Sequence, residues 1–501
     1  MTARRPGAGP PARARPPLPP GPYLVVGLAR SGAAAARMLA GHGEVIGSDA
    51  AAPAEANGLE GVELHLATDG MDLVSRARTV VKSPGVPNGA PAIRAARERG
   101  VEVVGELELA WRSLPAEYVA VTGTNGKTTT CELLGAIHRR ADIEVEVAGN
   151  VGTPLAALAL EERARPGLVV VCECSSFQLE DASAFAPECA VLLNIEEDHL
   201  DRHGTLAAYR DAKLRIFRNQ GEDDLAVLPL TLAEDGRAPA GAARVLTFGP
   251  AAATLSHESG ELRFRGEALM PAADVRLRGA HNLENAMAAA AAALGRGLDR
   301  TAVADALADF PGVRHRLEEV ARREGVLYVN DSKATNVASA LVGIEAFDGD
   351  VHAILGGSLK GGGFAGLRPA VAARCRACYL IGEAADRLGE DLEGTAPLHR
   401  CGDLERALGA AAREARPGEV VLLSPVCESF DQYADFEARG EHFGALAVGL
   451  GDDPWGGGRG RRDESRGARR SRVGWPPSAA SRASSTRCST RPPSACWPSE
   501  R

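Results

Sequence analysis

Short apolar runs rich in β-branched residues alternate along most of the chain with longer segments in which apolar residues recur at helical spacing. The three series of runs begin at Tyr23, at Tyr118 and near Val326. A β-strand followed by a helix, repeated in this way, predicts parallel sheets that are covered by helices on both faces. No internal repeat of fixed period is present, so a solenoid is not expected.

The pattern divides the chain into three α/β domains and two terminal segments. We place the domains at 21–115, 116–311 and 312–450, with a hinge at Pro311 and Gly312, where the pattern is interrupted. Residues 1–20 are rich in Arg and Pro and are expected to form a disordered extension. Residues 451–501 form a low-complexity tail with too few aliphatic side chains to offset chain entropy. The sequence leaves open whether this tail is a functional basic segment or the product of a shifted reading frame.

Composition and charge exclude several classes of protein. The chain has 501 residues, of which 45% are hydrophobic and 25% charged, which excludes wholesale disorder. No apolar run reaches the roughly 18 residues of a membrane-spanning helix, and residues 1–20 lack the apolar core of a signal peptide. The tail carries 11 Arg against 5 acidic residues, whereas the remainder carries 46 basic against 61 acidic residues. An acidic body argues against nucleic-acid binding.

Ten cysteines without an export signal indicate reduced thiols, and we expect a cytoplasmic protein. Cys172 and Cys174 form one close pair, and Cys375 and Cys378 form another. Neither pair is accompanied by a second pair at zinc-finger spacing, so buried structural thiols are the favoured interpretation.

The strongest chemical signal lies between a predicted strand and a predicted helix, from Gly123 to Thr129. A turn of this kind points backbone N–H groups at a phosphate, and the start of the following helix adds the positive end of its dipole. Lys127 can reach the β- and γ-phosphates, and the Thr128 hydroxyl can bind Mg²⁺. Val121 stands where the strict P-loop pattern has its first glycine. We therefore expect a P-loop-type central ATPase domain with a parallel sheet, between Rossmann-like N-terminal and C-terminal domains.

Polar residues that follow other predicted strands extend this site. Glu173 ends one strand and His199 follows another, and both can face the magnesium triphosphate at Thr128, because ligands collect at the carboxyl ends of parallel strands. Lys213 lies on a predicted amphipathic helix and, taken alone, is a surface lysine. In the first domain, Gly27 and Asp49 resemble an incomplete dinucleotide fingerprint, which leaves a phosphate site and a purely structural turn equally open.

The third domain places lysines and hydroxyls after three strands, as a pocket for an anionic ligand requires. These residues are Asp331, Lys333, Thr335, Lys360, Ser424 and Ser429.

Eight segments taken together resemble the Mur ligases of peptidoglycan synthesis. They are 122–129, 149–152, 173–180, 197–202, 281–285, 315–316, 331–336 and 429–432. Within that family, segments 331–336 and 429–432 are similar to the branch that adds D-glutamate to UDP-N-acetylmuramoyl-L-alanine. The Asp-Asn-Pro-Arg segment expected of the ligases that add the third residue is absent from this chain.

The resemblance implies an ATP-dependent ligase that forms an amide bond through an acyl phosphate, as a monomer that binds neither nucleic acid nor membrane. It implies two Mg²⁺ ions, one on Thr128 and Glu173 and one on His199 together with a carbamylated Lys213. Lys127, His199 and Lys213 would be the catalytic residues. The implied ATP-binding residues are Gly123, Thr124, Asn125, Gly126, Lys127, Thr128, Thr129, Asn285, Arg316 and Asp331. The implied substrate-binding residues are Ser31, Asp49 and Asn150 for the nucleotide sugar and Lys333, Thr335, Lys360, Ser429 and Phe436 for D-glutamate.

The chain departs from the family pattern at a few positions in these sites. Leu359 precedes Lys360 where relatives often carry Asp, and Glu428 stands beside Ser429 where a small residue is usual. Ala50 replaces a frequent hydroxyl residue. The alternatives that remain are another Mur-type or folylpolyglutamate-type ligase and a nucleotide-binding scaffold without catalysis. A nicotinamide oxidoreductase is less favoured, because the turn at Gly27 is incomplete.

Overall fold

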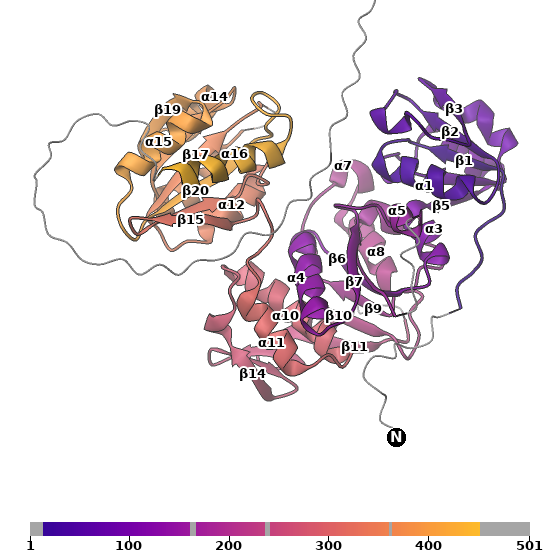
Figure 1. The fold of residues 1–501 in the computed structure, drawn as a ribbon, viewed down its shortest axis with the longest axis horizontal. Coiled ribbons are helices and arrows are strands. Elements are labelled where there is room, and N and C mark those ends of the chain that lie inside the picture. The colour runs from indigo at the N-terminus through magenta and orange to yellow at the C-terminus, as the bar shows by residue number, and fades with distance from the viewer. Residues whose placement is uncertain (1–13, 161–166, 236–240, 360–362, 451–501) are drawn as a thin grey trace, which may run out of the picture. The chain divides into compact units, whose positions relative to one another are not determined.

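The computed structural model describes residues 14–160, 167–235, 241–359 and 363–450. These residues form three groups of elements, each built around one sheet (Figure 1). The three-part α/β architecture predicted from the alternation of short apolar runs and helical segments is therefore confirmed. Along the described part of the chain, no helix has both the length and the apolar character required to cross a bilayer.

The first sheet is parallel and has the strand order β3-β2-β1-β4-β5. Its strands are β1 (Tyr23–Val26), β2 (Val45–Asp49), β3 (Val62–Leu66), β4 (Thr79–Lys82) and β5 (Glu102–Gly105). Alternate side chains of β1 enter different cores: Val25 packs with residues of α1 (Arg30–Ala40), whereas Leu24 packs with residues of α2 (Pro91–Glu98). The two helices therefore cover opposite faces, as expected for a Rossmann-like unit.

The second sheet has the order β14-β13-β12-β11-β10-β9-β6-β8-β7. Its strands are β6 (Glu117–Thr122), β7 (Val145–Gly149), β8 (Val169–Glu173), β9 (Cys189–Leu192), β10 (Leu225–Pro229), β11 (Arg244–Gly249), β12 (Leu255–Glu258), β13 (Glu261–Phe264) and β14 (Glu267–Pro271). The expected parallel sheet runs from β7 to β12, and β13 and β14 extend it as antiparallel strands. Two-residue turns with positive φ join these last strands, at Ser259-Gly260 (53° and 81°) and Arg265-Gly266 (53° and 81°). Such turns favour hairpins, because their twist matches that of paired strands.

Helices cover both faces of the second sheet. Val119 and Val121 share a core with α4 (Lys127–Arg140), α10 (Ala280–Gly295) and α11 (Arg300–Asp309). Every residue of α10 from Ala288 to Ala293 is fully buried. On the opposite face, Tyr118 and Ala120 pack with α3 (Glu106–Ser113) and α5 (Leu155–Leu160). The remaining helices of this part are α6 (Ser176–Glu180), α7 (Leu200–His203), α8 (Leu206–Leu214) and α9 (Leu230–Glu234).

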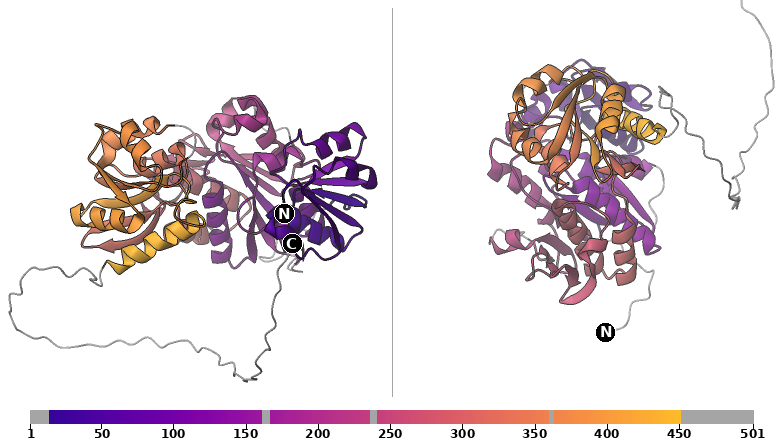
Figure 2. Two further views of the ribbon diagram at one scale, coloured as in Figure 1. Left: turned by 90° about the horizontal axis from the view of Figure 1, so that it is seen from above. Right: turned by 90° about the vertical axis from the view of Figure 1, so that its left-hand side faces the viewer.

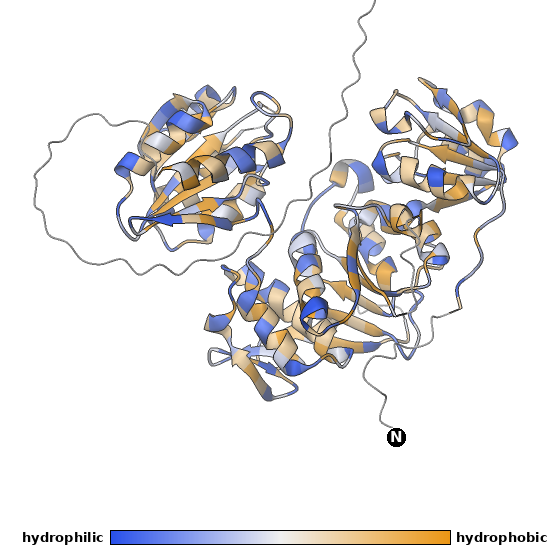
Figure 3. Cartoon of the chain, in the orientation of Figure 1, coloured by the Kyte–Doolittle hydropathy of each residue, from blue (hydrophilic) through white to orange (hydrophobic). Residues whose placement is uncertain are grey.

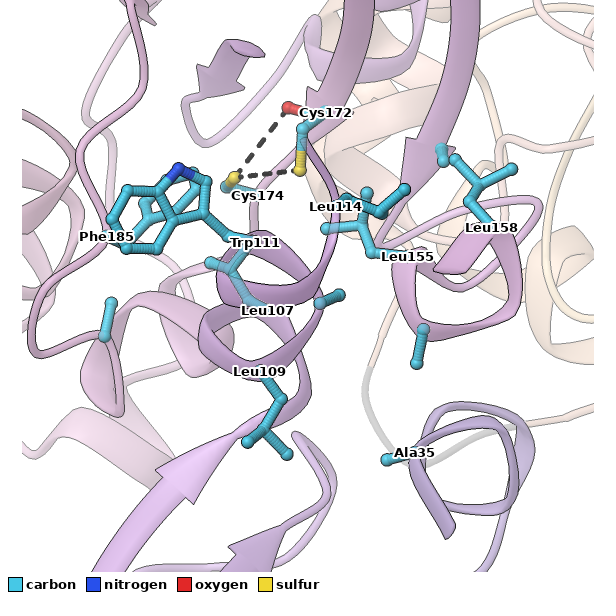
Figure 4. Close-up of a cluster of buried hydrophobic side chains, with 14 of the residues drawn as sticks. Ala35, Leu107, Leu109, Trp111, Leu114, Leu155, Leu158, Cys172, Cys174 and Phe185 are labelled. Carbon is cyan, nitrogen blue, oxygen red and sulfur yellow. Dashed lines mark hydrogen bonds between the residues drawn. The ribbon is translucent and has the colours of Figure 1, made fainter. Parts of the chain in front are cut away.

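Figure 4 shows part of the core formed by α3 and α5. The ring of Trp111 meets the ring of Phe185 edge to face, with their centroids 5.8 Å apart. Cys172 and Cys174 lie in the same core with their sulfur atoms 3.5 Å apart, and both are free thiols. Cys378 is also buried and free. The prediction of buried thiols is confirmed for these three residues, whereas Cys375, the fourth member of the two pairs, is only partly buried.

The third sheet has the order β15-β16-β20-β17-β18-β19, in which only β15 runs antiparallel among the described strands. Its strands are β15 (Glu318–Arg323), β16 (Val326–Asn330), β17 (Val351–Gly356), β18 (Cys375–Ile381), β19 (Leu398–Gly402) and β20 (Val420–Val426). One face carries α12 (Val337–Glu345), α13 (Arg368–Arg374) and α14 (Ala385–Asp391). The other carries α15 (Leu404–Glu414) and α16 (Phe436–Gly449), which can be followed in Figure 2.

Hydropathy follows this layering, because the strands are mostly apolar and the helices are polar on their outer sides (Figure 3). The short 3₁₀ helices are Ala54–Ala56, Met71–Arg76, Arg215–Phe217, Ala272–Asp274 and Ala365–Leu367.

Residues 14–20 differ from the expected disordered extension. Arg15 donates through Nη1 to the Trp111 carbonyl oxygen at 2.7 Å, and the Thr79 hydroxyl donates to the Pro20 carbonyl oxygen at 2.9 Å. Prolines lack an N–H group but keep their carbonyl acceptors. The segment is therefore held by donors from the folded part that reach these carbonyl oxygens and by the Arg15 side chain, which itself donates to the folded part. Residues 1–13 and the predicted tail at 451–501 lie outside the described residues.

Candidate active site

A tight turn joins β6 to α4, and it has the strand-turn-helix form predicted from the sequence. Gly126 caps α4 with a φ of 83°. A Cβ atom at this position would lie 2.1 Å from Asn285 Oδ1, so the turn also requires glycine for space. Asn285 is thereby placed against the turn. The N-terminal N–H groups of α4 are available to an anion at this point.

Lys127 folds back over the turn. Its Nζ donates to the carbonyl oxygens of Gly123 and Thr124 at 3.0 and 2.8 Å. Burial lowers the pKa of Lys127, while the carboxylate of Glu173 opposes that shift. The ammonium group is therefore held at the mouth of the turn, where the phosphates of a nucleotide would lie.

The loop after β9 fixes the other side of the turn. The backbone N–H of Asn125 donates to Asn194 Oδ1 at 2.8 Å, and Asn125 Nδ2 donates to Glu196 Oε2 at 2.9 Å. Thr124 N donates to the Asn194 carbonyl oxygen at 3.1 Å. Asn194 and Glu196 were not predicted as site residues, although both follow a strand, which was the only available signal.

Glu173 accepts hydrogen bonds from two other predicted site residues. The Thr128 hydroxyl donates to Glu173 Oε2 at 2.9 Å, and Asn150 Nδ2 donates to Oε1 at 3.0 Å. Glu173 is only 3% exposed. A carboxylate beside a hydroxyl supplies oxygen ligands, which Mg²⁺ prefers. The donor set at Thr128 and Glu173 therefore fits this cation. Within the described ranges, no cluster of three or more His, Cys, Asp or Glu side chains could hold a metal by itself.

Lys213 is buried, which corrects the interpretation of this residue as a surface lysine. It is 1% exposed, its Nζ donates to the Gly123 carbonyl oxygen at 2.6 Å, and it lies 4.5 Å from the centroid of the Tyr209 ring. Burial, assisted by the charge of Lys127, lowers its pKa to about 7. Tyr209 and Lys213 are four residues apart and share one face of α8. This four-residue spacing is the sequence signal that could have indicated that Lys213 is buried beside an aromatic ring.

His199 lies at the edge of the same region. It precedes α7 with a φ of 51°, and its ring lies 4.8 Å from that of Phe177 and 6.3 Å from that of Tyr209. The side chain is 47% exposed and lies 3.4 Å from Asp198. Tyr209 thus contacts both His199 and Lys213. The described contacts do not join His199 directly to Thr128 or Glu173.

In the first group of elements, Asp49 holds the turn after β1. Its carboxylate accepts hydrogen bonds from Leu28 N at 2.6 Å and from Ala51 N at 2.8 Å. Ser31 lies in the first turn of α1 and is partly exposed. A Cβ atom at Gly32 would lie 1.8 Å from the Gly27 carbonyl oxygen. The absence of a side chain at Gly32 therefore allows the first turn of α1 to approach the turn at Gly27 closely. Such a turn leaves the start of α1 accessible to an anion.

The third group contributes two residues that the resemblance assigned to ATP, the buried Asp331 and the partly buried Arg316. Asp331 accepts hydrogen bonds from the Ser424 hydroxyl at 2.8 Å and from Leu317 N at 3.3 Å, and burial raises its pKa to about 7. Burial lowers the pKa of Arg316, and its Nε is buried without a hydrogen-bond partner in the described part of the chain. An unpaired buried donor of this kind is costly unless a ligand satisfies it.

Three of the residues implied for D-glutamate follow strands of the third sheet: Lys333 and Thr335 come after β16, and Ser429 comes after β20. Lys333 Nζ lies 5.1 Å from the centroid of the Phe436 ring, and Thr335 follows in the same loop. The Ser429 hydroxyl is buried and has no hydrogen-bond partner among the described residues. Lys360 lies outside the described residues, and Leu359 before it is 53% exposed.

Three family models match successive parts of the chain. They are "Mur ligase MurD-like, N-terminal domain" over residues 22–105, "Mur ligase middle domain" over 121–293 and "Mur ligase, glutamate ligase domain" over 315–427.

Curated relatives match most of the chain. UDP-N-acetylmuramoylalanine--D-glutamate ligase of Acidobacterium capsulatum is 42% identical over 447 residues, covering 85% of this chain and 95% of the relative. The protein of the same name from Anaeromyxobacter dehalogenans is 44% identical over 463 residues, covering 85% and 96%.

Solved structures show the same fold at lower identity. UDP-N-acetylmuramate-alanine ligase of Thermotoga maritima gives a TM-score of 0.54 at 20% identity, covering 86% of this chain and 99% of that one. A MurF ligase from the same organism, solved in complex with ADP, gives a TM-score of 0.52 at 19% identity, covering 81% of this chain and 88% of that one.

Proposed function

The chain belongs to the Mur ligase family, and on that basis we propose that it joins D-glutamate to UDP-N-acetylmuramoyl-L-alanine at the expense of ATP. This reaction would be a cytoplasmic step of peptidoglycan synthesis. The observation that carries the proposal is the contact of Thr128 with Glu173 at 2.9 Å beside the turn that holds Lys127. Hydroxyl, carboxylate and ammonium groups in this arrangement suit a magnesium–nucleotide complex.

In the first step, the carboxylate of the nucleotide sugar peptide attacks the γ-phosphorus of ATP, forming an acyl phosphate and releasing ADP. Lys127 and the first N–H groups of α4 stabilise the charge on the transferring phosphoryl group. Thr128 and Glu173 would hold Mg²⁺, which neutralises phosphate charge when bound. Asn150, hydrogen-bonded to Glu173 at 3.0 Å, is positioned to orient the substrate near the same carboxylate.

We assign a second Mg²⁺ to His199 and a carbamylated Lys213. A carbamate on Lys213 would convert a cation into a carboxylate-like ligand on a long arm. Its burial and its lowered pKa favour the neutral amine, which is the form that reacts with carbon dioxide. The Lys213 Nζ lies at the phosphate turn, 2.6 Å from the Gly123 carbonyl oxygen, so the modified group would lie next to the transferring phosphate.

In the second step, the amine of D-glutamate attacks the acyl carbonyl carbon, and inorganic phosphate leaves. Lys333, Thr335, Lys360, Ser429 and Phe436 would hold D-glutamate. The unpaired Ser429 hydroxyl supports this role, because a buried polar group without a partner is expected where a ligand binds.

We further propose that each predicted domain binds a different substrate. Residues 21–115 would bind the uridine diphosphate through Ser31 and Asp49, 116–311 would bind ATP, and 312–450 would bind the amino acid. Movement about Pro311 and Gly312, whose φ is 93°, would bring amine and acyl phosphate together and exclude water. The enzyme would act as a monomer on small-molecule substrates. A crosslink that prevents movement at this hinge should abolish turnover, and unchanged turnover would contradict the closure.

The decisive experiment mixes the purified full chain with ATP, Mg²⁺ and UDP-N-acetylmuramoyl-L-alanine and adds single amino acids in turn. We expect ADP formation that depends on D-glutamate, with the amide product identified by mass spectrometry. Lys127→Ala should abolish it. ADP formation with another amino acid or acceptor would favour a different Mur-type or folylpolyglutamate-type ligase. Nucleotide binding without ADP formation in any mixture would favour a non-catalytic scaffold.

A further inference from the structure

Three loops that follow neighbouring strands of the third sheet meet at one arginine on α16. The strands β16, β20 and β17 are adjacent in that sheet. The loop after β16 carries Lys333 and Thr335, the loop after β20 carries Ser429, and the loop after β17 begins at Gly357. No role was predicted for the arginine itself, Arg439.

The guanidinium of Arg439 bonds two of these loops directly. Its Nε donates to the Ser332 hydroxyl at 3.0 Å, and its Nη2 donates to the Ser332 carbonyl oxygen at 2.8 Å. Nη2 also reaches the Cys427 carbonyl oxygen at 3.1 Å, and Nη1 reaches the Glu428 carbonyl oxygen at 3.1 Å. The five N–H groups of a planar guanidinium can join several acceptors in a fixed geometry, which a lysine cannot reproduce.

The third loop packs against the same group. A Cβ atom at Gly357 would lie 3.0 Å from Arg439 Nη1 and 2.1 Å from the Glu428 carbonyl oxygen. The backbone N–H of Ser358 donates to that same carbonyl oxygen at 2.9 Å. The Ser332 hydroxyl in turn donates to the Phe436 carbonyl oxygen at 2.8 Å, which ties the start of α16 to the loop after β16.

The Arg439 guanidinium also places a buried positive charge beside these three loops. Arg439 is 1% exposed, and all four of its hydrogen-bond acceptors are uncharged. Among the described ion pairs, none within 4.0 Å involves Arg439. Its pKa is lowered to about 10 by burial, so the group stays protonated at neutral pH. The carboxylates of Asp431 and Glu428 act on the guanidinium through their charge and raise its pKa, without an ion pair within 4.0 Å among the described residues. A buried cation of this kind favours anions in its surroundings.

We propose that Arg439 is the positioning residue of the amino-acid subsite, setting the spacing between Lys333, Thr335 and Ser429 and supplying positive charge for a dicarboxylic amino acid. The inference rests on the proposed function of the third domain. It also explains how the chain accommodates Glu428 beside Ser429: the Glu428 backbone is fixed by Arg439 and Ser358, and the guanidinium charge offsets the added carboxylate.

The test compares Arg439→Met and Arg439→Lys with Arg323→Met in the full chain. Arg323 is a matched control, because it also bonds α16 carbonyl oxygens, at Ala447 (3.1 Å) and Val448, but lies at the far end of that helix. We expect the KM for D-glutamate to rise at least about tenfold in Arg439→Met and by less in Arg439→Lys, which retains the charge. The KM values for ATP and the nucleotide sugar should change less than about twofold. Arg323→Met should leave all three KM values unchanged.

Equal changes in all KM values, or an unchanged KM for D-glutamate, would overturn the proposal. Hydrogen exchange monitored by mass spectrometry provides a readout independent of activity. Peptides that contain Ser332, Gly357 and Ser429 should exchange faster in Arg439→Met but not in Arg323→Met, and unchanged exchange would contradict the positioning role.

Wild-type activity separates this inference from the proposed function. If the wild type uses another amino acid, the proposed substrate is wrong, and the KM for that amino acid becomes the test of Arg439. If the wild type forms no ADP in any mixture, the proposed function fails and the exchange data alone decide the positioning role.

Discussion

Glu106 provides a measurable link between a buried carboxyl group and the pH dependence of stability. It is the first residue of α3, and its Oε1 accepts a hydrogen bond from Ala156 N, in the first turn of α5, at 2.7 Å. Its Oε2 is buried and has no hydrogen-bond partner in the described part of the chain. Burial raises the pKa of Glu106 to about 7 from an ordinary value of 4.5, although the backbone N–H groups of Leu155 and Ala156 oppose the shift.

The sign of the effect follows from proton binding. Between pH 4.5 and 7 the folded state retains the Glu106 proton while the unfolded state has released it. The folded state therefore binds more protons in this window, and stability falls as pH rises through it. The pKa difference corresponds to about 3 kcal/mol as an upper limit, at about 1.4 kcal/mol per unit. The loss should be complete once the pH is well above 7.

The perturbation is Glu106→Gln, which keeps an acceptor for Ala156 N but cannot ionise. Thermal unfolding of the wild type and the variant should be followed by calorimetry from pH 5 to pH 8.5. Because the other titrating groups are common to both proteins, the difference between their Tm values isolates Glu106. We expect the variant to gain stability relative to the wild type as pH rises, with most of the gain between pH 5 and 7.5. Parallel pH profiles for the two proteins would refute the reasoning.

Three further predictions concern the nucleotide site. Gly126→Ala should weaken ATP binding at least about tenfold in titration calorimetry, because the added Cβ would lie 2.1 Å from Asn285 Oδ1. Gly260→Ala is the control: Gly260 has a similar φ but open space around it, so this variant should leave the ATP affinity unchanged. Glu173→Gln should raise the Mg²⁺ concentration needed for half-maximal ADP formation, because a neutral amide is a poorer ligand for a hard cation, and an unchanged requirement would remove Glu173 from the metal site. Ligase activity should fall when bicarbonate and dissolved carbon dioxide are removed and should return when they are restored. Intact-mass spectra of the wild type should show a carbamate adduct that the Lys213→Ala variant lacks. Activity that does not depend on carbon dioxide would contradict the modification.

The sequence predicted those parts of the structure that depend on local periodicity. In β6, Tyr118 and Ala120 enter one core while Val119 and Val121 enter the other, as period-two alternation requires. The turn at Gly123–Thr129 was predictable for a similar reason, since its glycine, lysine and hydroxyl residues follow one another along the chain.

Features that depend on contacts between distant residues were not predictable in this way. Arg439 bonds Ser332 across 107 positions of sequence, and no local pattern reports such a pair. Lys213 taken alone was interpreted as a surface lysine, and only the family resemblance assigned it to the site; its Nζ donates to the Gly123 carbonyl oxygen, 90 positions away. Residues 14–20 have the composition of a free segment, yet their proline carbonyl oxygens meet donors such as the Thr79 hydroxyl.

The run of small side chains in α10 connects the turn between β6 and α4 to the interior of the protein. Asn285, which lies against the phosphate turn, immediately precedes the stretch from Ala286 to Ala293, in which every alanine is fully buried. Close packing leaves no spare volume for a bulkier residue there. A larger side chain in this stretch would move the helix and Asn285 with it. A substitution that alters the packing of the core would therefore also alter the turn between β6 and α4. A larger residue within this alanine run is therefore expected to change nucleotide affinity and stability together.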